Sequence, residues 1–278
     1  MGISLMDKMK EMASGKVTKS QRVLLNYFLS ISLSKTIYMS ITQLAEVTGV
    51  AEATVLRFCR SLGCNGYQEF KFRLAQESAS YVQETEDDEE AQNAKSLVEE
   101  YKNALDFCEQ MIFSNDINAA VRMIAEAKTV TCCGVGHSYL AALELHSRFT
   151  KMGIISHCEF DMNFSNILVS QRGKEDVLVL FSVSGGTKDI LEVASRACSV
   201  GMKIICITAY EKSPLVRYAD HVIVTGNKEA PLSAGAVSSI VLQMFTVDVL
   251  CRLLHRTDKK RFDDAVAKGN VATASKLI

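Results

Sequence analysis

The chain has 278 residues, of which 48% are hydrophobic, enough for one large domain or for two modest domains that each bury a core. No uninterrupted apolar run approaches the ~18–20 residues of a membrane-spanning helix, so we expect no membrane partner. The nine cysteines are scattered, several lie inside apolar runs, and none forms a C-x-x-C pair. This pattern predicts reduced thiols in a cytoplasmic protein and argues against a metal site.

The formal net charge of −1 conceals three regions of different charge. Residues 1–76 carry ten basic and five acidic side chains, residues 77–100 carry one and nine, and the remaining residues carry twenty and eighteen. We therefore predict a basic domain over residues 1–77, an acidic linker over 78–94 and a second domain over 95–278. A small basic domain points to nucleic acid as a partner.

The basic domain contains the pattern of a helix-turn-helix. Apolar residues at helical spacing occupy residues 18–33, and two shorter periodic stretches follow at 41–47 and 55–62. Gly49 separates the two short stretches, and Gly63 ends the second one. Two short helices joined by a glycine-containing turn are typical of DNA-binding proteins, in which the second helix enters the major groove.

Several residues of this domain are candidates for contact with DNA. Arg57 could read a guanine edge or hold a phosphate, and Thr54 could contact a phosphate or a thymine methyl group. The alternative for any single arginine is plain solvation on an exposed helix face. The candidate DNA-binding residues are Gln43, Ala51, Glu52, Thr54, Arg57, Arg60 and Lys71.

The stretch ITQLAEVTGVAEATVLRFCRSLGCNGYQEFKFRLA resembles the N-terminal domain of RpiR/MurR-type bacterial transcription regulators. The resemblance implies an α-helical helix-turn-helix domain that binds operator DNA. The chain departs from the family at Ala51, where a serine usually caps the recognition helix or contacts a phosphate. Ala51 can do neither, and the lost cap costs about 1 kcal/mol of local stability. The operator sequence of relatives therefore cannot be transferred to this chain.

The acidic segment ETEDDEEAQNAK has almost no apolar content. Like charges at this density repel one another and stay solvated, so we interpret the segment as part of a linker. The alternative is a DNA mimic that competes for the basic domain.

From about residue 95 onward, apolar strands alternate with helical stretches. Five strands are predicted at TVTCCGV, IISHC, DVLVLFS, KIICITA and HVIV, with a short helix after Pro214 and longer helices at 137–151, 163–170, 187–199 and 233–255. Strands this apolar are buried on both faces, which predicts a parallel sheet with helices on each side. The expected fold of this domain is an α/β three-layer sandwich.

Ligands of such folds bind at the carboxyl ends of the strands, where loops lead into helix N-termini. Two loops at these positions, CGVGHSYLA and SVSGGTKDI, are rich in glycine and hydroxyl groups. In the second loop, Gly185 and Gly186 are expected to expose N–H groups beside three hydroxyls, and the dipole of the following helix adds positive potential. These features predict a site for a small anion, most simply a phosphate, although the first loop alone could be a tight turn.

Residues 128–250 resemble the sugar isomerase (SIS) domain, an α/β sandwich that binds phosphosugars; the matching pieces are GVGHS, SVSGGTKDI, ITAYEKSPLVRYADHVI and the closing helix. The resemblance implies that Ser138, Ser182, Ser184 and Thr187 hold the phosphate, and that copies associate through this domain as a homodimer or tetramer. RpiR/MurR-type regulators join the two domains in this order. No cofactor is expected. The candidate phosphosugar-binding residues are Gly134, Gly136, His137, Ser138, Ser182, Ser184, Gly185, Gly186, Thr187 and Glu229.

An aldose–ketose isomerase would need a base beside the sugar carbon, and His137, His221 and Glu229 are the candidates. We interpret His137 as a helix-start residue that helps to hold the anion, and His221, at the head of a strand, as structural. No acid–base pair with a family-specific spacing is evident. Together with the DNA-binding domain, this favours a sensor over an enzyme, so no catalytic residue is assigned.

The sequence therefore predicts a regulator of sugar-metabolism genes whose binding to double-stranded operator DNA is controlled by a phosphorylated sugar. One alternative is a phosphosugar isomerase with an accessory N-terminal helical domain. A second alternative is a non-catalytic regulator of another enzyme, acting by protein contact alone. The identity of the sugar and the direction of regulation do not follow from the residues.

Overall fold

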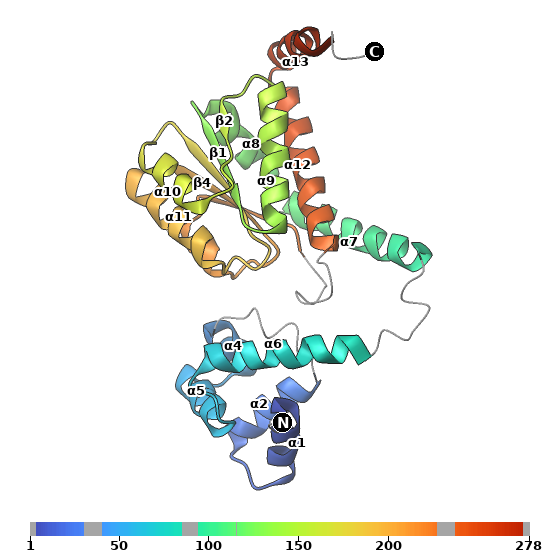
Figure 1. The fold of residues 1–278 in the computed structure, drawn as a ribbon, viewed down its shortest axis with the longest axis vertical. Coiled ribbons are helices and arrows are strands. Elements are labelled where there is room, and N and C mark those ends of the chain that lie inside the picture. The colour runs from blue at the N-terminus through green and yellow to red at the C-terminus, as the bar shows by residue number, and fades with distance from the viewer. Residues whose placement is uncertain (1–3, 31–40, 85–93, 115, 227–236, 275–278) are drawn as a thin grey trace. The chain divides into compact units, whose positions relative to one another are not determined.

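The computed structural model describes residues 4–30, 41–84, 94–114, 116–226 and 237–274, and it divides the chain into two compact units (Figure 1). The first unit holds the described residues up to Glu99, and the second holds those from Glu100 onward. Each unit has its own hydrophobic core. Among the described residues, no helix has the length and apolar character needed to cross a membrane.

The first unit is helical in its described part, as predicted. Its helices are α1 (Leu5–Ser14), α2 (Lys19–Ser30), α4 (Ile41–Thr48), α5 (Glu52–Ser61) and α6 (Tyr67–Glu84). Gly49 follows α4 with a φ of +66°, and Gly63 follows α5 with a φ of +83°. This left-handed conformation strains other residues, which explains why glycine ends both helices of the helix-turn-helix.

Three phenylalanine rings form the centre of this first core. The ring of Phe28 in α2 stacks on Phe58 of α5 at a centroid distance of 5.7 Å and meets Phe70 of α6 edge-on at 5.0 Å. All three side chains are fully buried. The rings therefore join α2, α5 and α6 around one centre.

Helix α6 extends into the range predicted as the acidic linker. It anchors itself through Tyr67, Phe70 and Leu74, which are buried one turn apart, and it ends at Glu84. Residues 85–93 lie outside the described part, and α7 (Ala94–Ser114) begins at the far end of the predicted linker. The boundaries 1–77, 78–94 and 95–278 remain a prediction.

The second unit contains a sheet of five parallel strands. The strands are β1 (Val130–Gly134), β2 (Ser156–His157), β3 (Val177–Phe181), β4 (Lys203–Thr208) and β5 (His221–Val224). Their order is β2-β1-β3-β4-β5, and every neighbouring pair is parallel. The predicted strands and the α/β three-layer sandwich are confirmed.

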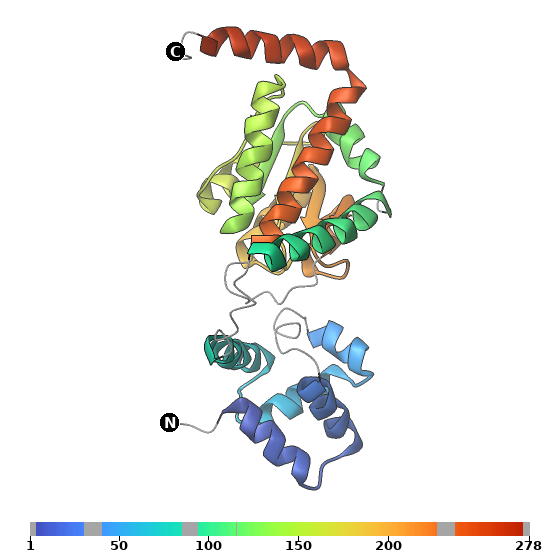
Figure 2. The same cartoon turned by 90° about the vertical axis from the view of Figure 1, so that its right-hand side faces the viewer.

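Helices cover both faces of this sheet (Figures 1 and 2). One face is covered by α8 (Ile117–Glu126), α9 (His137–Lys151) and α12 (Val237–Thr257), the other by α10 (Met162–Ser170) and α11 (Lys188–Val200). Within β3, Val179 and Phe181 pack against the first set, whereas Leu178 and Leu180 pack against the second. Because successive side chains of a strand point to opposite faces, a continuous apolar run serves both cores.

The remaining elements border the sandwich. Helix α7 contributes Cys108 and Ile112 to the α8–α9–α12 core, and α13 (Lys259–Thr273) contributes Phe262. A 3₁₀ helix, η1 (Pro214–Tyr218), connects β4 to β5 along the chain.

The carboxyl ends of β1 and β3 are neighbours in the sheet. Gly134, the last residue of β1, pairs in register with Phe181, the last residue of β3. The loop after each strand leads directly into a helix, α9 after β1 and α11 after β3. The two loops singled out from the sequence therefore leave the same edge of the sheet from adjacent strands.

Candidate functional site

The loop after β1 makes a turn that only glycine fits. A Cβ atom on Gly134 would lie 2.3 Å from the carbonyl oxygen of Ser138, so the backbone of β1 approaches the first turn of α9 very closely. Gly136 occupies the N-cap position of α9 with a φ of +62°. Both glycines are therefore required to bring the N-terminus of α9 to the carboxyl end of β1.

The two polar residues that follow this turn have different environments. His137, the first residue of α9, is exposed. Ser138 is buried, with 7% of its surface exposed, and its hydroxyl oxygen accepts a hydrogen bond from Nε2 of Gln243 in α12 at 3.1 Å. Ser138 is therefore fixed by a second helix, whereas His137 faces solvent.

The loop after β3 is closed by bonds between its own residues. The hydroxyl oxygen of Ser182 accepts a hydrogen bond from the N–H of Gly185, and that of Ser184 accepts one from the N–H of Gly186, both at 3.2 Å. The expectation that both glycines present free N–H groups is therefore wrong. A serine hydroxyl can accept a bond from a nearby backbone N–H group in place of an outside acceptor. Here Ser182 and Ser184 accept the bonds of these two N–H groups.

The same bonds leave the serine hydroxyl protons available. A hydroxyl that accepts one bond still has one proton to donate. Thr187 occupies the N-cap of α11 without a side-chain capping bond, so its hydroxyl also makes no bond to the helix start. Ser184 and Thr187 are partly exposed and can present their hydroxyls to an anion beside the positive end of α11, whereas Ser182 is only 3% exposed.

Gly185 allows this loop to pack against Ser213 and η1. It is buried, its φ is +58°, and a Cβ atom there would lie 2.2 Å from the hydroxyl oxygen of Ser213. The N–H of Leu215 donates to the carbonyl oxygen of Gly185 at 3.0 Å, which ties the loop to η1. Gly186, in contrast, is exposed, with nothing closer than 3.9 Å to a Cβ position.

Glu229 and His221 are the other two residues considered as a base for an isomerase. Glu229 lies outside the described residues. His221 begins β5, and the amino end of a parallel strand lies at the opposite edge of the sheet from the two loops. Among the described residues, no group of three His, Cys, Asp or Glu side chains could hold a metal ion.

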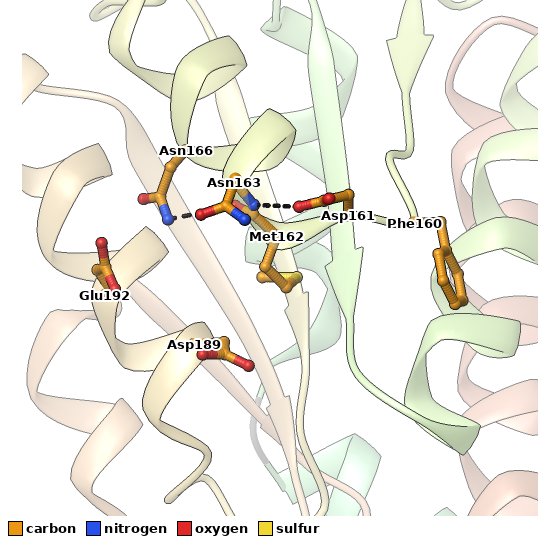
Figure 3. Close-up of a pocket in the computed structure, with 7 residues that line it drawn as sticks. All are labelled: Phe160, Asp161, Met162, Asn163, Asn166, Asp189 and Glu192. Carbon is orange, nitrogen blue, oxygen red and sulfur yellow. Dashed lines mark hydrogen bonds between the residues drawn. The ribbon is translucent and has the colours of Figure 1, made fainter.

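A polar pocket that the sequence reasoning missed lies between α10 and α11 (Figure 3). It has a volume of about 310 Å³ and is lined by Phe160, Asp161, Met162, Asn163, Asn166, Asp189 and Glu192. Asp161 caps α10 by accepting from the N–H of Asn163 at 2.7 Å, and Nδ2 of Asn166 donates to the carbonyl oxygen of Met162 at 3.2 Å. Three carboxylates make this pocket unsuitable for a phosphate. Its capping residue, Asp161, lies four positions after the end of β2, in a loop that leads from a strand end into a helix, and that position is the sequence signal that could have identified the pocket.

The candidate DNA-binding face is built on α5. Ala51 holds the N-cap position of this helix and makes no side-chain capping bond, as expected from its side chain. Glu52, Arg57 and Arg60 are exposed. Nη2 of Arg57 donates to the hydroxyl oxygen of Thr54 at 3.2 Å, so the two residues form one polar group on the first turns of α5.

Two further DNA-binding candidates lie on other helices. Lys71 of α6 is partly buried, with its ammonium group 5.2 Å from the centroid of the Tyr67 ring, and burial lowers its pKa below the usual value. The side chain of Gln43 lies outside the described part of α4. Lys71 thus uses part of its side chain to cover the first core.

Comparison with known proteins gives a consistent assignment for both units. Residues 4–81 match the model of the helix-turn-helix domain of the rpiR family, and residues 123–253 match that of the SIS domain. An uncharacterised HTH-type transcriptional regulator of Clostridium perfringens is 30% identical over 273 residues, which cover 95% of each chain. The chain belongs to the rpiR family of HTH-type transcriptional regulators.

Solved structures share the fold of this rpiR-family regulator. The NanR protein of Vibrio vulnificus, in complex with ManNAc-6P, aligns over 99% of both chains with a TM-score of 0.82 and 24% identity. A Methanococcus jannaschii protein, for which a 3-hexulose-6-phosphate isomerase function has been inferred, covers 62% of the regulator and 96% of its own chain, with a TM-score of 0.53 and 20% identity. The whole architecture therefore recurs in NanR, and the SIS fold alone recurs in a protein of another class.

Proposed function

We propose that the regulator controls sugar-metabolism genes and that a phosphorylated sugar, held between the loops after β1 and β3, controls its binding to operator DNA. The observation that carries this proposal is the convergence of the two loops at one edge of the sheet. Ser138 and the hydroxyl groups of Ser182, Ser184 and Thr187 come from adjacent strand ends, beside the N-termini of α9 and α11. Hydroxyl donors beside two helix N-termini suit a phosphate.

The comparisons support a sugar phosphate as the ligand class. NanR shares the complete architecture, and its structure contains a sugar phosphate. The SIS match spans both loops. The proposal leaves the sugar itself to be identified by binding measurements.

We further propose that the site binds its ligand without converting it. His137 is the one imidazole beside the two loops among the described residues, and it is exposed rather than held against a second acid or base. The regulator shares the fold of its second unit with the M. jannaschii protein, so sugar-phosphate isomerisation is the second candidate function. Interconversion of a sugar phosphate by the purified protein, abolished by His137→Ala, would establish that second candidate.

Control of DNA binding requires linkage between the two sites. The sugar phosphate must bind the DNA-competent and DNA-incompetent states with different affinities, because a ligand with equal affinity for both shifts neither. We propose that a cytoplasmic homodimer or tetramer, associated through the SIS domain, places two α5 helices in successive major grooves. An operator with two half-sites about one helical turn apart is expected.

The ligand site is tested by calorimetry with a panel of sugar phosphates on the purified regulator. The double variant Ser184→Ala/Thr187→Val removes two hydroxyl donors and should weaken binding at least about tenfold, because hydrogen bonds to charged groups are the stronger ones. Ser199→Ala is the matched control, since its hydroxyl donates to the Arg196 carbonyl oxygen inside α11. Unchanged affinity in the double variant would overturn the site.

Regulation is tested by fluorescence anisotropy on labelled DNA from upstream of the regulator's own gene, with unrelated DNA as competitor. Each sugar phosphate of the panel is added in turn. Specific binding that one sugar phosphate shifts would support the whole proposal and identify the ligand. Specific binding that no sugar phosphate alters would contradict ligand control and leave the DNA-binding role standing.

A further inference from the structure

A glutamine in the second unit is buried with half of its amide group unsatisfied. Gln243 lies in α12 with 2% of its surface exposed. Its Nε2 donates to the hydroxyl oxygen of Ser138, whereas its Oε1 is buried and has no partner among the described residues. Buried polar atoms without partners are rare and destabilising, so an apolar side chain would suit the core better here.

The surroundings of Gln243 are otherwise those of a core position. Its neighbour Leu242 is 1% exposed and belongs to the core between α12 and the sheet, and Thr246, one turn later, is fully buried. Helices α9 and α12 lie side by side in both views (Figures 1 and 2). The bond from Gln243 to Ser138 joins these helices across 105 residues of sequence at the first turn of α9.

The direction of this bond decides what Ser138 can do. A serine hydroxyl has one proton to donate and lone pairs that accept. Because the Gln243 N–H occupies a lone pair, the Ser138 proton cannot point toward Gln243. Within the described residues no acceptor takes that proton, and Ser138 lies two positions after Gly136, where the loop after β1 enters α9.

We propose that Gln243 is a positioning residue that fixes the Ser138 hydroxyl as a hydrogen-bond donor to the bound phosphate. This inference rests on the proposed phosphosugar site. The amide N–H orients the Ser138 hydroxyl toward the loop. The hydroxyl is therefore already ordered before the anion binds. The unpaired Oε1 is then the stability cost of keeping an amide at a core position.

The inference is tested by measuring inorganic phosphate binding calorimetrically to the full chain. Gln243→Met keeps the length of the side chain but removes both the N–H and the unpaired oxygen. We expect about fivefold to tenfold weaker phosphate binding than in the wild type, together with an unfolding midpoint equal to or above that of the wild type. A merely structural role would instead lower the midpoint and leave phosphate binding unchanged.

Gln243→Glu provides a readout that depends on pH. An ionised carboxylate can only accept, so it would draw the Ser138 proton toward itself and repel the anion. The ratio of variant to wild-type dissociation constants should therefore rise as the carboxyl ionises with increasing pH; taking the ratio at each pH cancels the titration of phosphate itself. If the ratio of dissociation constants did not change with pH, the inference would be overturned.

A double-mutant cycle with Ser138→Ala completes the test. If Gln243 acts through Ser138, Gln243→Met should have no further effect on phosphate binding in the Ser138→Ala background. Equal effects in both backgrounds would overturn the positioning role. The Ser184→Ala/Thr187→Val variant distinguishes failure of the phosphate site from failure of the positioning role of Gln243. If it loses phosphate while the Gln243 variants bind like the wild type, only the role of Gln243 fails. Absence of phosphate binding by the wild type would overturn both.

Discussion

Arg57 and Thr54 are joined on the exposed side of α5 by a hydrogen bond of 3.2 Å from Nη2 to the threonine hydroxyl oxygen. The bond spans one turn of the helix and directs the guanidinium group toward the N-terminal end of α5. In a helix-turn-helix that end of the second helix meets base edges and phosphates. Thr54 therefore pre-orders the arginine, which would lower the conformational entropy lost if Arg57 contacts DNA.

Arg57→Ala should weaken operator binding by about 1–3 kcal/mol if the guanidinium reads a base. The same change should reduce discrimination between operator and unrelated DNA. Fluorescence anisotropy at several salt concentrations measures both effects. Arg22→Ala, an exposed arginine of α2 that bonds to the Ala13 carbonyl oxygen, is the matched control. A uniform loss on all sequences, with a shallower salt dependence, would instead assign Arg57 to a phosphate.

Gly185→Ala should destabilise the second unit, because the new Cβ would lie 2.2 Å from Oγ and 2.4 Å from Cβ of Ser213. The left-handed backbone adds strain of about 1–3 kcal/mol. Urea unfolding should therefore show a loss of at least about 2 kcal/mol. Gly186→Ala is the control one residue away: it meets nothing closer than 3.9 Å, and it should be neutral or stabilising by up to about 1 kcal/mol. Equal stability of the two variants would contradict the geometry of the loop.

Much of the second unit could be predicted from the sequence because its signals are local. Strand β3 is an uninterrupted apolar run because both of its faces are buried, and Gly134 is a glycine because the first turn of α9 lies against it. The two loops are identified by their glycine-rich and hydroxyl-rich composition at the ends of predicted strands. Local chemistry also explains the wrong expectation about the N–H groups of Gly185 and Gly186, since the serines that identified the loop are the groups that occupy those donors.

Features that depend on tertiary contacts could not be predicted from sequence patterns. Gln243 is one polar residue in an apolar stretch, and its role depends on a contact with a residue 105 positions away. The pocket between α10 and α11 combines Asp161 and Asp189, which no motif connects. Helix α6 continues to Glu84, although its last residues resemble a linker in composition.

Glu77→Ala should destabilise the first unit. The carboxylate of Glu77 in α6 accepts hydrogen bonds from the N–H groups of Leu5 and Met6, the latter at 3.0 Å, and so caps the start of α1. Removing a helix N-terminal cap costs about 1 kcal/mol. Because Leu5 and Met9 of α1 belong to the first core, the loss should appear in the unfolding of the whole unit.

Thermal unfolding followed by circular dichroism measures this loss. Glu11→Ala, an exposed glutamate of α1, is the control and should change stability by less than about 0.5 kcal/mol. Equal melting of the Glu77 and Glu11 variants would show that the cap contributes nothing. A shift in the second unit's transition alone would also contradict the assignment, because the contact lies entirely within the first unit.

His157 should make the second unit sensitive to acid. Burial lowers the pKa of this β2 residue, and its interactions with the Arg172 guanidinium and the His146 imidazole lower it further. Between the lowered folded pKa and the ordinary value of about 6.5, the unfolded chain binds more protons than the folded one. Stability therefore falls as the pH falls through about 6.5, and the loss grows until the folded pKa is reached.

His157→Gln should remove this part of the acid sensitivity. Chemical unfolding at pH 8 and at pH 5.5 measures it: relative to the wild type, the variant should gain stability on going from pH 8 to pH 5.5. The comparison at pH 8, where the imidazole is neutral in both states, isolates any effect of the substitution on packing. Some sensitivity should persist in the variant, because burial also lowers the pKa of His221 at the start of β5. If the variant and the wild type lost the same stability between pH 8 and pH 5.5, His157 would not be the group that takes up the proton on unfolding.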